Sequence, residues 1–234
     1  MLNEYFADMV DIIDQHDGIL DKYIGDAIMA LFGVPFTGAR DERNALNAAN
    51  GMMRALQALN ERRVKAGQEP LMHGIGVNTG EAIAGNIGSP KRMDYTVIGD
   101  AVNLTARVES VTTYYGTPIL VSDLTLRRLA DVEHVREVDR IRVKGKTEAV
   151  TLYESYAWRS ERLSDDINRS YALQQSGLER FREQGWTEAI QLFTEAKQLS
   201  PEDRVPELYL ERIHHYQLYP PGDDWDGVWT MQSK

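Results

Sequence analysis

The sequence has no cysteine, no excess of basic residues and no long uncharged apolar run. The absence of cysteine excludes disulfides, thiolate metal sites and cysteine nucleophiles, and it fits a reducing compartment, so we expect a cytoplasmic protein. No segment approaches the roughly 18 apolar residues of a membrane span, and residues 1–18 lack the pattern of a signal peptide. The net charge of −10 argues against nucleic-acid binding, which requires a basic face.

The 234 residues, 42% of them hydrophobic, suffice for one core with a small appendage. Hydrophobic periodicity predicts helices over 2–16, 41–66 and 101–113, and Ser122 is a candidate cap for a short helix ending at Ala130. It predicts strands over 19–24, 27–32, 72–77, 82–87, 95–98, 119–121, 134–143 and 149–156. Strands and helices mix without strict alternation, so we expect an α+β domain with a mixed sheet over residues 1–157.

The pattern changes after Trp158, where β-type segments almost disappear. Residues 165–219 are predicted to be helical and carry the offsets of one tetratricopeptide unit at Leu173, Gly177, Ala189, Phe193, Ala196 and Pro201. A single unit cannot bury its own apolar face, so it must pack on the helix at 203–218, on the preceding domain or on a protein partner. Residues 220–234 are predicted to be an irregular tail with exposed aromatic side chains.

A first candidate for chemistry is Asp26, which follows Gly25 at the tip of the hairpin predicted over 19–32. A carboxylate at such a tip can hold Mg²⁺ or Mn²⁺ together with phosphate oxygens. Gly-Asp pairs are also ordinary turn residues, and the residue types alone favour that simpler interpretation.

Two further segments carry polar groups suited to phosphate. Asn103 and Arg107 are four residues apart on a predicted helix and therefore share one face. An amide and a guanidinium suit triphosphate oxygens, although periodicity alone favours an exposed polar face. Lys144 and Lys146 flank Gly145 between two predicted strands, where a solvated turn is the simpler alternative to a phosphate-binding loop.

Four runs of the sequence together resemble the successive signatures of class III adenylyl and guanylyl cyclases. They are DKYIGDAIMALFG, GIGVNTGEAIAGNIG, YTVIGDAVNLTARVES and VKGKTEAV, and they occur in the family's order over residues 1 to about 156. Any one run would be a weak indication, whereas four in order are specific. The resemblance implies an α+β domain that forms a homodimer, with active sites built at the interface by both subunits.

The resemblance also implies roles for single residues. Asp26 matches the second of two metal-binding aspartates, which together hold two Mg²⁺ or Mn²⁺ ions. Asn103 matches the asparagine that positions the ribose and the transition state, whereas Arg107 and Lys144 match groups that contact the phosphates. The implied reaction is attack of the ribose 3′-oxygen of ATP on the α-phosphorus, which yields 3′,5′-cyclic AMP and pyrophosphate.

Base selection is implied by two positions of the same resemblance. Lys22 matches the lysine that reads the adenine ring, and Thr96 matches its purine-contacting partner. A threonine there resembles the bicarbonate-responsive branch, whereas guanylyl cyclases carry Glu and Cys at these two positions. We therefore expect an adenylate cyclase that uses ATP in cyclic-nucleotide signalling.

One feature of the family pattern has no match in this sequence. The family places a strand with a first metal aspartate ahead of the helix at 2–16, so we expect an N-terminally truncated domain, which either a fragment or a misplaced start codon would explain. The alternative is a catalytically silent module that binds nucleotide or a partner. A guanylyl cyclase is disfavoured by Lys22 and Thr96, and a pure helical-repeat adaptor would account for too little of the chain.

Overall fold

The computed structural model describes residues 2–142, 148–159, 163–222 and 224–230. The predicted phosphate ligand Lys144 lies outside these residues. The elements in chain order are α1 (Leu2–Gln15), β1 (Ile19–Ile24), β2 (Ala27–Leu31), α2 (Asp41–Lys65), β3 (Ile75–Val77), β4 (Ile83–Ser89), β5 (Arg92–Ile98), α3 (Asp100–Ser110), α4 (Thr112–Tyr115), β6 (Ile119–Ser122), α5 (Asp123–Leu126), β7 (Val135–Arg142), β8 (Val150–Ser155), α6 (Asp165–Arg182), α7 (Trp186–Leu199), α8 (Arg204–Leu218) and β9 (Trp229–Thr230).

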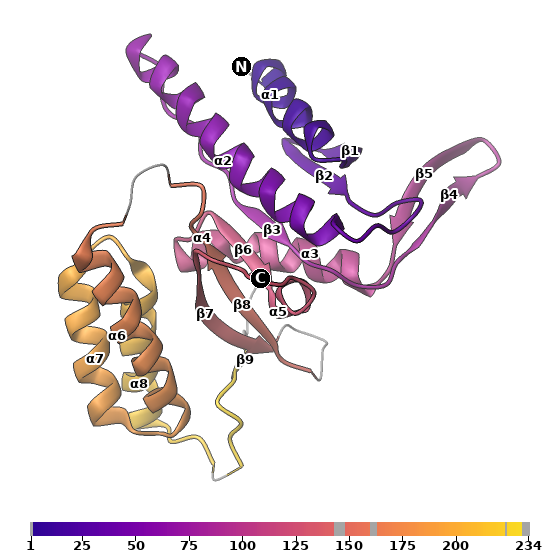
Figure 1. Ribbon diagram of the computed structural model, residues 1–234. Coiled ribbons are helices and arrows are strands. Elements are labelled where there is room, and N and C mark those ends of the chain that lie inside the picture. Colours follow the sequence, from indigo (N-terminus) through magenta and orange to yellow (C-terminus); the bar gives the residue numbers. More distant parts are fainter. Residues whose placement is uncertain (1, 143–147, 160–162, 223, 231–234) are drawn as a thin grey trace.

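The central sheet has the strand order β3-β6-β8-β7-β9. The β3–β6 and β7–β9 pairs are parallel, whereas β8 is antiparallel to both of its neighbours. This arrangement confirms the predicted α+β fold with a mixed sheet. Two hairpins, β1–β2 and β4–β5, form separate two-stranded sheets, and the β4–β5 hairpin projects from the body of the molecule (Figure 1).

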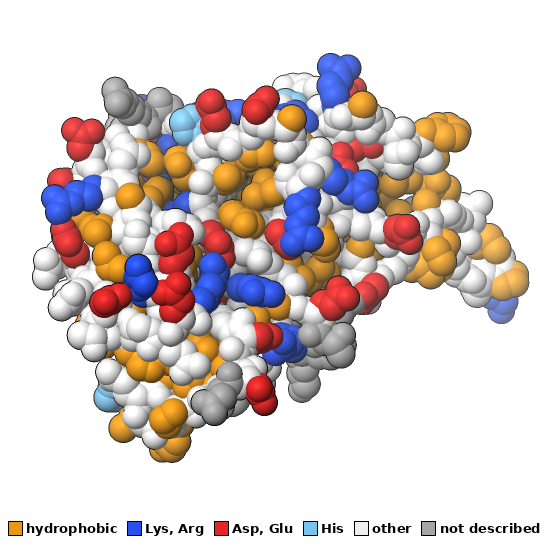
Figure 2. Space-filling view, turned by 60° about the horizontal axis from the view of Figure 1, so that its bottom comes forward, with side chains coloured by type: hydrophobic (Ala, Val, Ile, Leu, Met, Phe, Trp, Pro, Cys, Tyr) orange, Lys and Arg blue, Asp and Glu red, His pale blue; other side chains and the backbone are white. Residues whose placement is uncertain are grey.

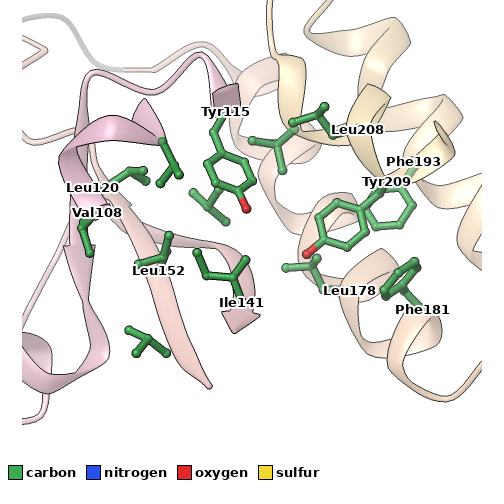
Figure 3. Close-up of a cluster of buried hydrophobic side chains, with 14 of the residues drawn as sticks. Val108, Tyr115, Leu120, Ile141, Leu152, Leu178, Phe181, Phe193, Leu208 and Tyr209 are labelled. Atoms are coloured by element: carbon green, nitrogen blue, oxygen red, sulfur yellow. The ribbon is translucent and has the colours of Figure 1, made fainter. Parts of the chain in front are cut away.

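Two apolar clusters hold the elements together. One lies beneath α1 and α2, where Met9, Leu59 and Ile119 are almost completely buried. The other joins the sheet to the three C-terminal helices, and Figure 3 shows side chains from both parts pointing toward one another. Within this second cluster Tyr115 and Leu152 come from the first part of the chain and Phe193 from the helices. None of the described helices is long and apolar enough to cross a membrane.

The helices α6, α7 and α8 pack on one another and on the sheet, as a unit with one uncovered face requires. Gly177 of α6 is essential to this contact, because a Cβ at that position would lie 2.8 Å from the Phe193 ring. A buried ion pair reinforces the attachment. The Arg136 guanidinium of β7 donates to Glu154 at 2.7 Å and to Gln174 of α6 at 2.6 Å, and it also pairs with Asp203 before α8.

Three expectations about local structure were wrong. Ser122 does not cap the following helix, because its hydroxyl donates instead to Asn78 at 2.7 Å, and α5 ends at Leu126 rather than Ala130. The C-terminal segment is not wholly irregular, since Trp229 and Thr230 pair with β7. Its tryptophans are not freely exposed either: Trp225 packs against Phe181 and other rings of the helical unit.

A buried histidine gives the fold a pH-dependent stability. The His73 ring lies 2.8 Å from the Tyr5 hydroxyl, and burial lowers the pKa of His73 to about 4. The unfolded chain, with an ordinary histidine pKa of about 6.5, binds the extra proton more readily between these values. The free energy of unfolding should therefore fall by about 3 kcal/mol as the pH drops from about 6.5 to about 4.

Denaturant titrations across this pH range test the expectation. His73→Gln should remove most of the pH dependence that wild type shows in this window, whereas the same change at the exposed His214 should leave it intact. Equal slopes for wild type and His73→Gln would show that His73 is not the responsible group.

Candidate active site

The β1–β2 hairpin presents Lys22 and Asp26 to solvent. The turn is tight, with Ile24 paired to Ala27, and Gly25 adopts a φ of 65°, a left-handed conformation that glycine reaches without strain. Asp26 follows at the tip and is exposed, and the side chain of Lys22 is 43% exposed. Both charged groups are thus available to a ligand.

Thr96 lies on β5, 74 residues further along the chain, yet the structure brings it close to Lys22. The link is Asp21. Thr96 donates a 2.9 Å hydrogen bond to Asp21 Oδ2, and the Lys22 ammonium lies 3.4 Å from the same oxygen. Thr96 is buried, and the Asp21 side chain is only 1% exposed. Lys22 and Thr96 therefore face one shared carboxylate.

An irregularity in β1 makes this arrangement possible. Leu20 pairs with Ala30 and Lys22 pairs with Met29, so Asp21 is an extra residue in its strand. In a regular strand consecutive side chains point to opposite faces, whereas a bulge redirects one of them. The bulge thus allows the adjacent Asp21 and Lys22 side chains to meet.

The helix α3 begins directly after β5 and carries the other two predicted residues. Asn103 lies exposed in its first turn, and the half-buried Arg107 follows one turn later on the same face. Neither side chain has a hydrogen-bond or ion-pair partner among the described residues. An amide and a fixed guanidinium fork, both unengaged, suit an anionic ligand near this helix.

The Asp26 carboxylate fits the protein's share of a Mg²⁺ or Mn²⁺ site. Such ions take oxygen ligands and are commonly held by one or two carboxylates together with substrate phosphates. In the described ranges no three His, Asp or Glu side chains group closely enough to hold a metal ion by themselves. The charge of Asp26 also acts on Tyr5 of α1. Burial of Tyr5, and secondarily this charge, raise the pKa of Tyr5 to about 12.

Sequence reasoning missed Asp21. The only local signal was a break in the alternation of Ile19-Leu20-Asp21-Lys22, where two charged residues follow each other within a strand. Its partner Thr96 is distant in the sequence, so only the folded chain reveals the contact.

Comparison with known proteins identifies the family and the fold of the chain. The family model described as the adenylate and guanylate cyclase catalytic domain matches residues 1–154. Among solved structures, the adenylyl cyclase CyaB from P. aeruginosa is similar with a TM-score of 0.59 and 33% identity, covering 69% of this chain and 83% of that one. The guanylyl cyclase Cya2 is similar with a TM-score of 0.58 and 39% identity, covering 65% and 77%. The fold is therefore that of the class III nucleotidyl cyclases.

Curated relatives extend the comparison to sequence. An adenylate cyclase of Anabaena cylindrica is 42% identical over 160 residues, which are 65% of this chain and 31% of that protein. The terminal-differentiation-specific adenylate cyclase of Dictyostelium discoideum is 33% identical over 215 residues, 90% of this chain but only 10% of that protein. The chain thus spans at most a third of these relatives' length. It belongs to the adenylate and guanylate cyclase catalytic domain family.

Proposed function

We propose that this chain is the catalytic part of an adenylate cyclase that converts ATP to 3′,5′-cyclic AMP and pyrophosphate. The observation that carries the proposal is that Lys22 and Thr96 both contact the Asp21 carboxylate. Lys22 lies on the same hairpin as Asp26, and Thr96 lies on the strand that leads into the helix of Asn103 and Arg107. The adenylate cyclase names of the Anabaena and Dictyostelium relatives support the same substrate.

Each group has a distinct task in this reaction. Asp26 holds Mg²⁺ or Mn²⁺, two ions per site in the intact family, and these ions supply charge neutralisation at the reacting oxygens when bound. Asn103 orients the ribose so that its 3′-oxygen lies in line with the α-phosphorus, and Arg107 binds phosphate oxygens whose charge shifts during the transfer. Lys144 is proposed as a further phosphate ligand from the sequence alone.

Adenine selection rests on Lys22 and Thr96. An ammonium donates to the N1 acceptor of adenine, and a hydroxyl oxygen can accept from its exocyclic amino group. Because Lys22 and Thr96 resemble the corresponding pair of the bicarbonate-responsive branch, we propose that the chain is related to that branch. The similarity to the guanylyl cyclase Cya2 makes GTP the competing substrate.

We propose a homodimer in which each site takes Asp26 from one subunit and Lys22, Thr96, Asn103, Arg107 and Lys144 from the other. Exposed apolar side chains on the hairpins support such an interface: Ile24, Ile83, Met93 and Tyr95 are each more than half exposed. Figure 2 shows hydrophobic side chains gathered on the projecting β4–β5 arm. Exposed apolar side chains that gather on one part of a surface are typical of contact sites.

The helical segment over residues 165–219 is proposed to be a tetratricopeptide-like unit. The close approach of Gly177 to Phe193, with Ala189 and Ala196 fully buried, supports the assignment. Because one apolar face of this unit is covered by α8 and the sheet, a protein partner would bind its remaining surface.

Product analysis with both nucleotides tests the function. With Mn²⁺ present, the chain should form cyclic AMP from ATP at a kcat/KM at least about tenfold above that for cyclic GMP from GTP, since guanine presents the opposite hydrogen-bonding groups to Lys22 and Thr96 and the loss of even one charged hydrogen bond is worth about that factor. Higher turnover of GTP would contradict the assignment to ATP. Tight ATP binding without any product would instead favour the silent nucleotide-binding module.

A further inference from the structure

The buried carboxylate of Asp21 is placed between the two residues that would read the base. It comes from a bulge in β1 and accepts a hydrogen bond from Thr96 while lying 3.4 Å from the Lys22 ammonium, both at the same oxygen. Its side chain is 1% exposed, so a ligand cannot reach it directly. Asp21 can therefore affect a bound nucleotide only by positioning Lys22 and Thr96.

We propose that Asp21 is the positioning residue for purine selection: it holds the Thr96 hydroxyl as a hydrogen-bond acceptor toward the base and holds the Lys22 ammonium beside it as a donor. The inference rests on the proposed use of a purine nucleotide at this site. It adds a residue that the Lys/Thr pair alone does not predict.

The Thr96 hydroxyl has only one proton to donate. A hydroxyl has one proton and two lone pairs, whereas a carboxylate can only accept. Because Thr96 gives its single proton to Asp21, only its lone pairs remain for a ligand. Without Asp21 the hydroxyl could rotate and donate, and Thr96 would no longer distinguish a donor from an acceptor on the base.

This polarity matches adenine and opposes guanine. Adenine offers an amino donor at C6 and an acceptor at N1, which complement the Thr96 oxygen and the Lys22 ammonium respectively. Guanine instead offers a hydrogen-bond acceptor at O6 and a donor at N1–H. Guanine O6 would face the Thr96 oxygen, acceptor against acceptor, and guanine N1–H would face the Lys22 ammonium, donor against donor. Buried polar groups left without hydrogen-bond partners discriminate strongly between substrates.

Lys22 depends on the same carboxylate. A lysine side chain has a flexible four-carbon stem, so its ammonium occupies one position only when something holds it there. Asp21 is its only ion-pair partner within the described chain. The bulge in β1 supplies that contact at the cost of regular strand pairing, and bulges are frequently found where a side chain must be redirected next to an active site.

The test measures binding and turnover of ATP and GTP, with Mn²⁺, for wild type, Asp21→Leu, Asp21→Asn and Thr96→Val. Binding is followed with fluorescent analogues of both nucleotides, so the readout does not depend on turnover alone. Asp21→Leu should lower the ATP-over-GTP preference roughly tenfold, the size of one charge-assisted hydrogen bond. Asp21→Asn should retain more of the preference, because its amide oxygen can still accept from Thr96.

A double variant separates a positioning role from a merely structural one. If Asp21 acts through Thr96, Asp21→Leu combined with Thr96→Val should lose no more preference than the worse single variant. The matched control is Asp14→Asn, at an exposed α1 carboxylate with no side-chain partner among the described residues, and it should leave the preference unchanged. Thermal melts report whether each variant folds, and Asp21→Asn remains informative if the leucine variant does not.

The outcomes distinguish this inference from the function on which it rests. A wild-type preference for ATP that persists in both Asp21 variants would overturn the role of Asp21 and leave the adenylate cyclase proposal standing. Additive losses in the double variant would likewise overturn it. A wild-type chain that binds neither nucleotide, or prefers GTP, would overturn both.

Discussion

Asn103→Ala and Arg107→Ala are each expected to lower cyclic AMP formation by about 10²–10³-fold, with the loss mainly in kcat. Both side chains lie on one face of α3 without partners among the described residues, and both would contact charge that develops during transfer. A contact made chiefly in the transition state affects the rate more than ground-state affinity. Steady-state kinetics with ATP and Mn²⁺ give the kcat and KM of each variant.

Two further substitutions control this prediction. Arg107→Lys keeps the charge but loses the planar fork, so it should recover only part of the lost rate. Glu109→Gln alters an exposed charge on another face of the same helix and should change kcat less than about twofold. A loss confined to KM in the Asn103 and Arg107 variants would show that they bind ATP without taking part in the chemistry.

Arg212→Leu is expected to lower the free energy of unfolding by about 3–5 kcal/mol. Arg212 of α8 is 2% exposed and lies 2.7 Å from Asp139 of β7, which also accepts hydrogen bonds from Tyr115 at 2.5 Å and Tyr209 at 2.6 Å. Burial, and then the charge of Asp139, raise the pKa of both tyrosines and keep their protons in place. Removing the guanidinium leaves a buried carboxylate without its countercharge.

The geometry of the Arg212–Asp139 pair also predicts the effect of replacing both residues. Arg212 and Asp139 meet as an ion pair without well-aligned hydrogen bonding, and the Nε of Arg212 is buried with no partner in the described structure. Replacing both residues, as Arg212→Leu with Asp139→Asn, should therefore restore part of the loss.

Chemical denaturation of these variants measures the effect against a surface pair. The exposed Arg169–Glu195 pair of the same helical unit is the matched control, and Arg169→Leu should cost no more than about 1 kcal/mol. Equal losses for Arg212→Leu and Arg169→Leu would contradict a central role for the buried network. In Figure 3 the two tyrosines that serve this network point into the space between the sheet and the helices.

Local sequence signals were enough for most of the fold. The hairpin around Gly25-Asp26 and the long helix over 41–66 follow from turn chemistry and periodicity, and the structure confirms both. Signals that depend on distant partners were insufficient. Ser122 resembles a helix cap in sequence, but Asn78, 44 residues earlier, takes its proton. Trp229 looks like part of a tail until it pairs with β7.

The candidate site divides in the same way. The spacing of Asn103 and Arg107 placed them correctly on one helical face, because four residues make one turn. The proximity of Lys22 to Thr96 came only from family resemblance, since no local rule joins β1 to β5. Asp21 was not predicted at all, because its role depends on a bulge and on a contact between two hairpins.

The central claim is that Asp26 and the Asn103–Arg107 face act together in one ATP-cyclising site shared between two chains. The most direct test is to measure cyclic AMP formation by Asp26→Ala, by Asn103→Ala and by their equimolar mixture. Each variant alone should be nearly inactive, whereas the mixture should regain up to about a quarter of wild-type activity, because random pairing gives half heterodimers with one intact site each. A mixture no more active than either variant alone would contradict the claim.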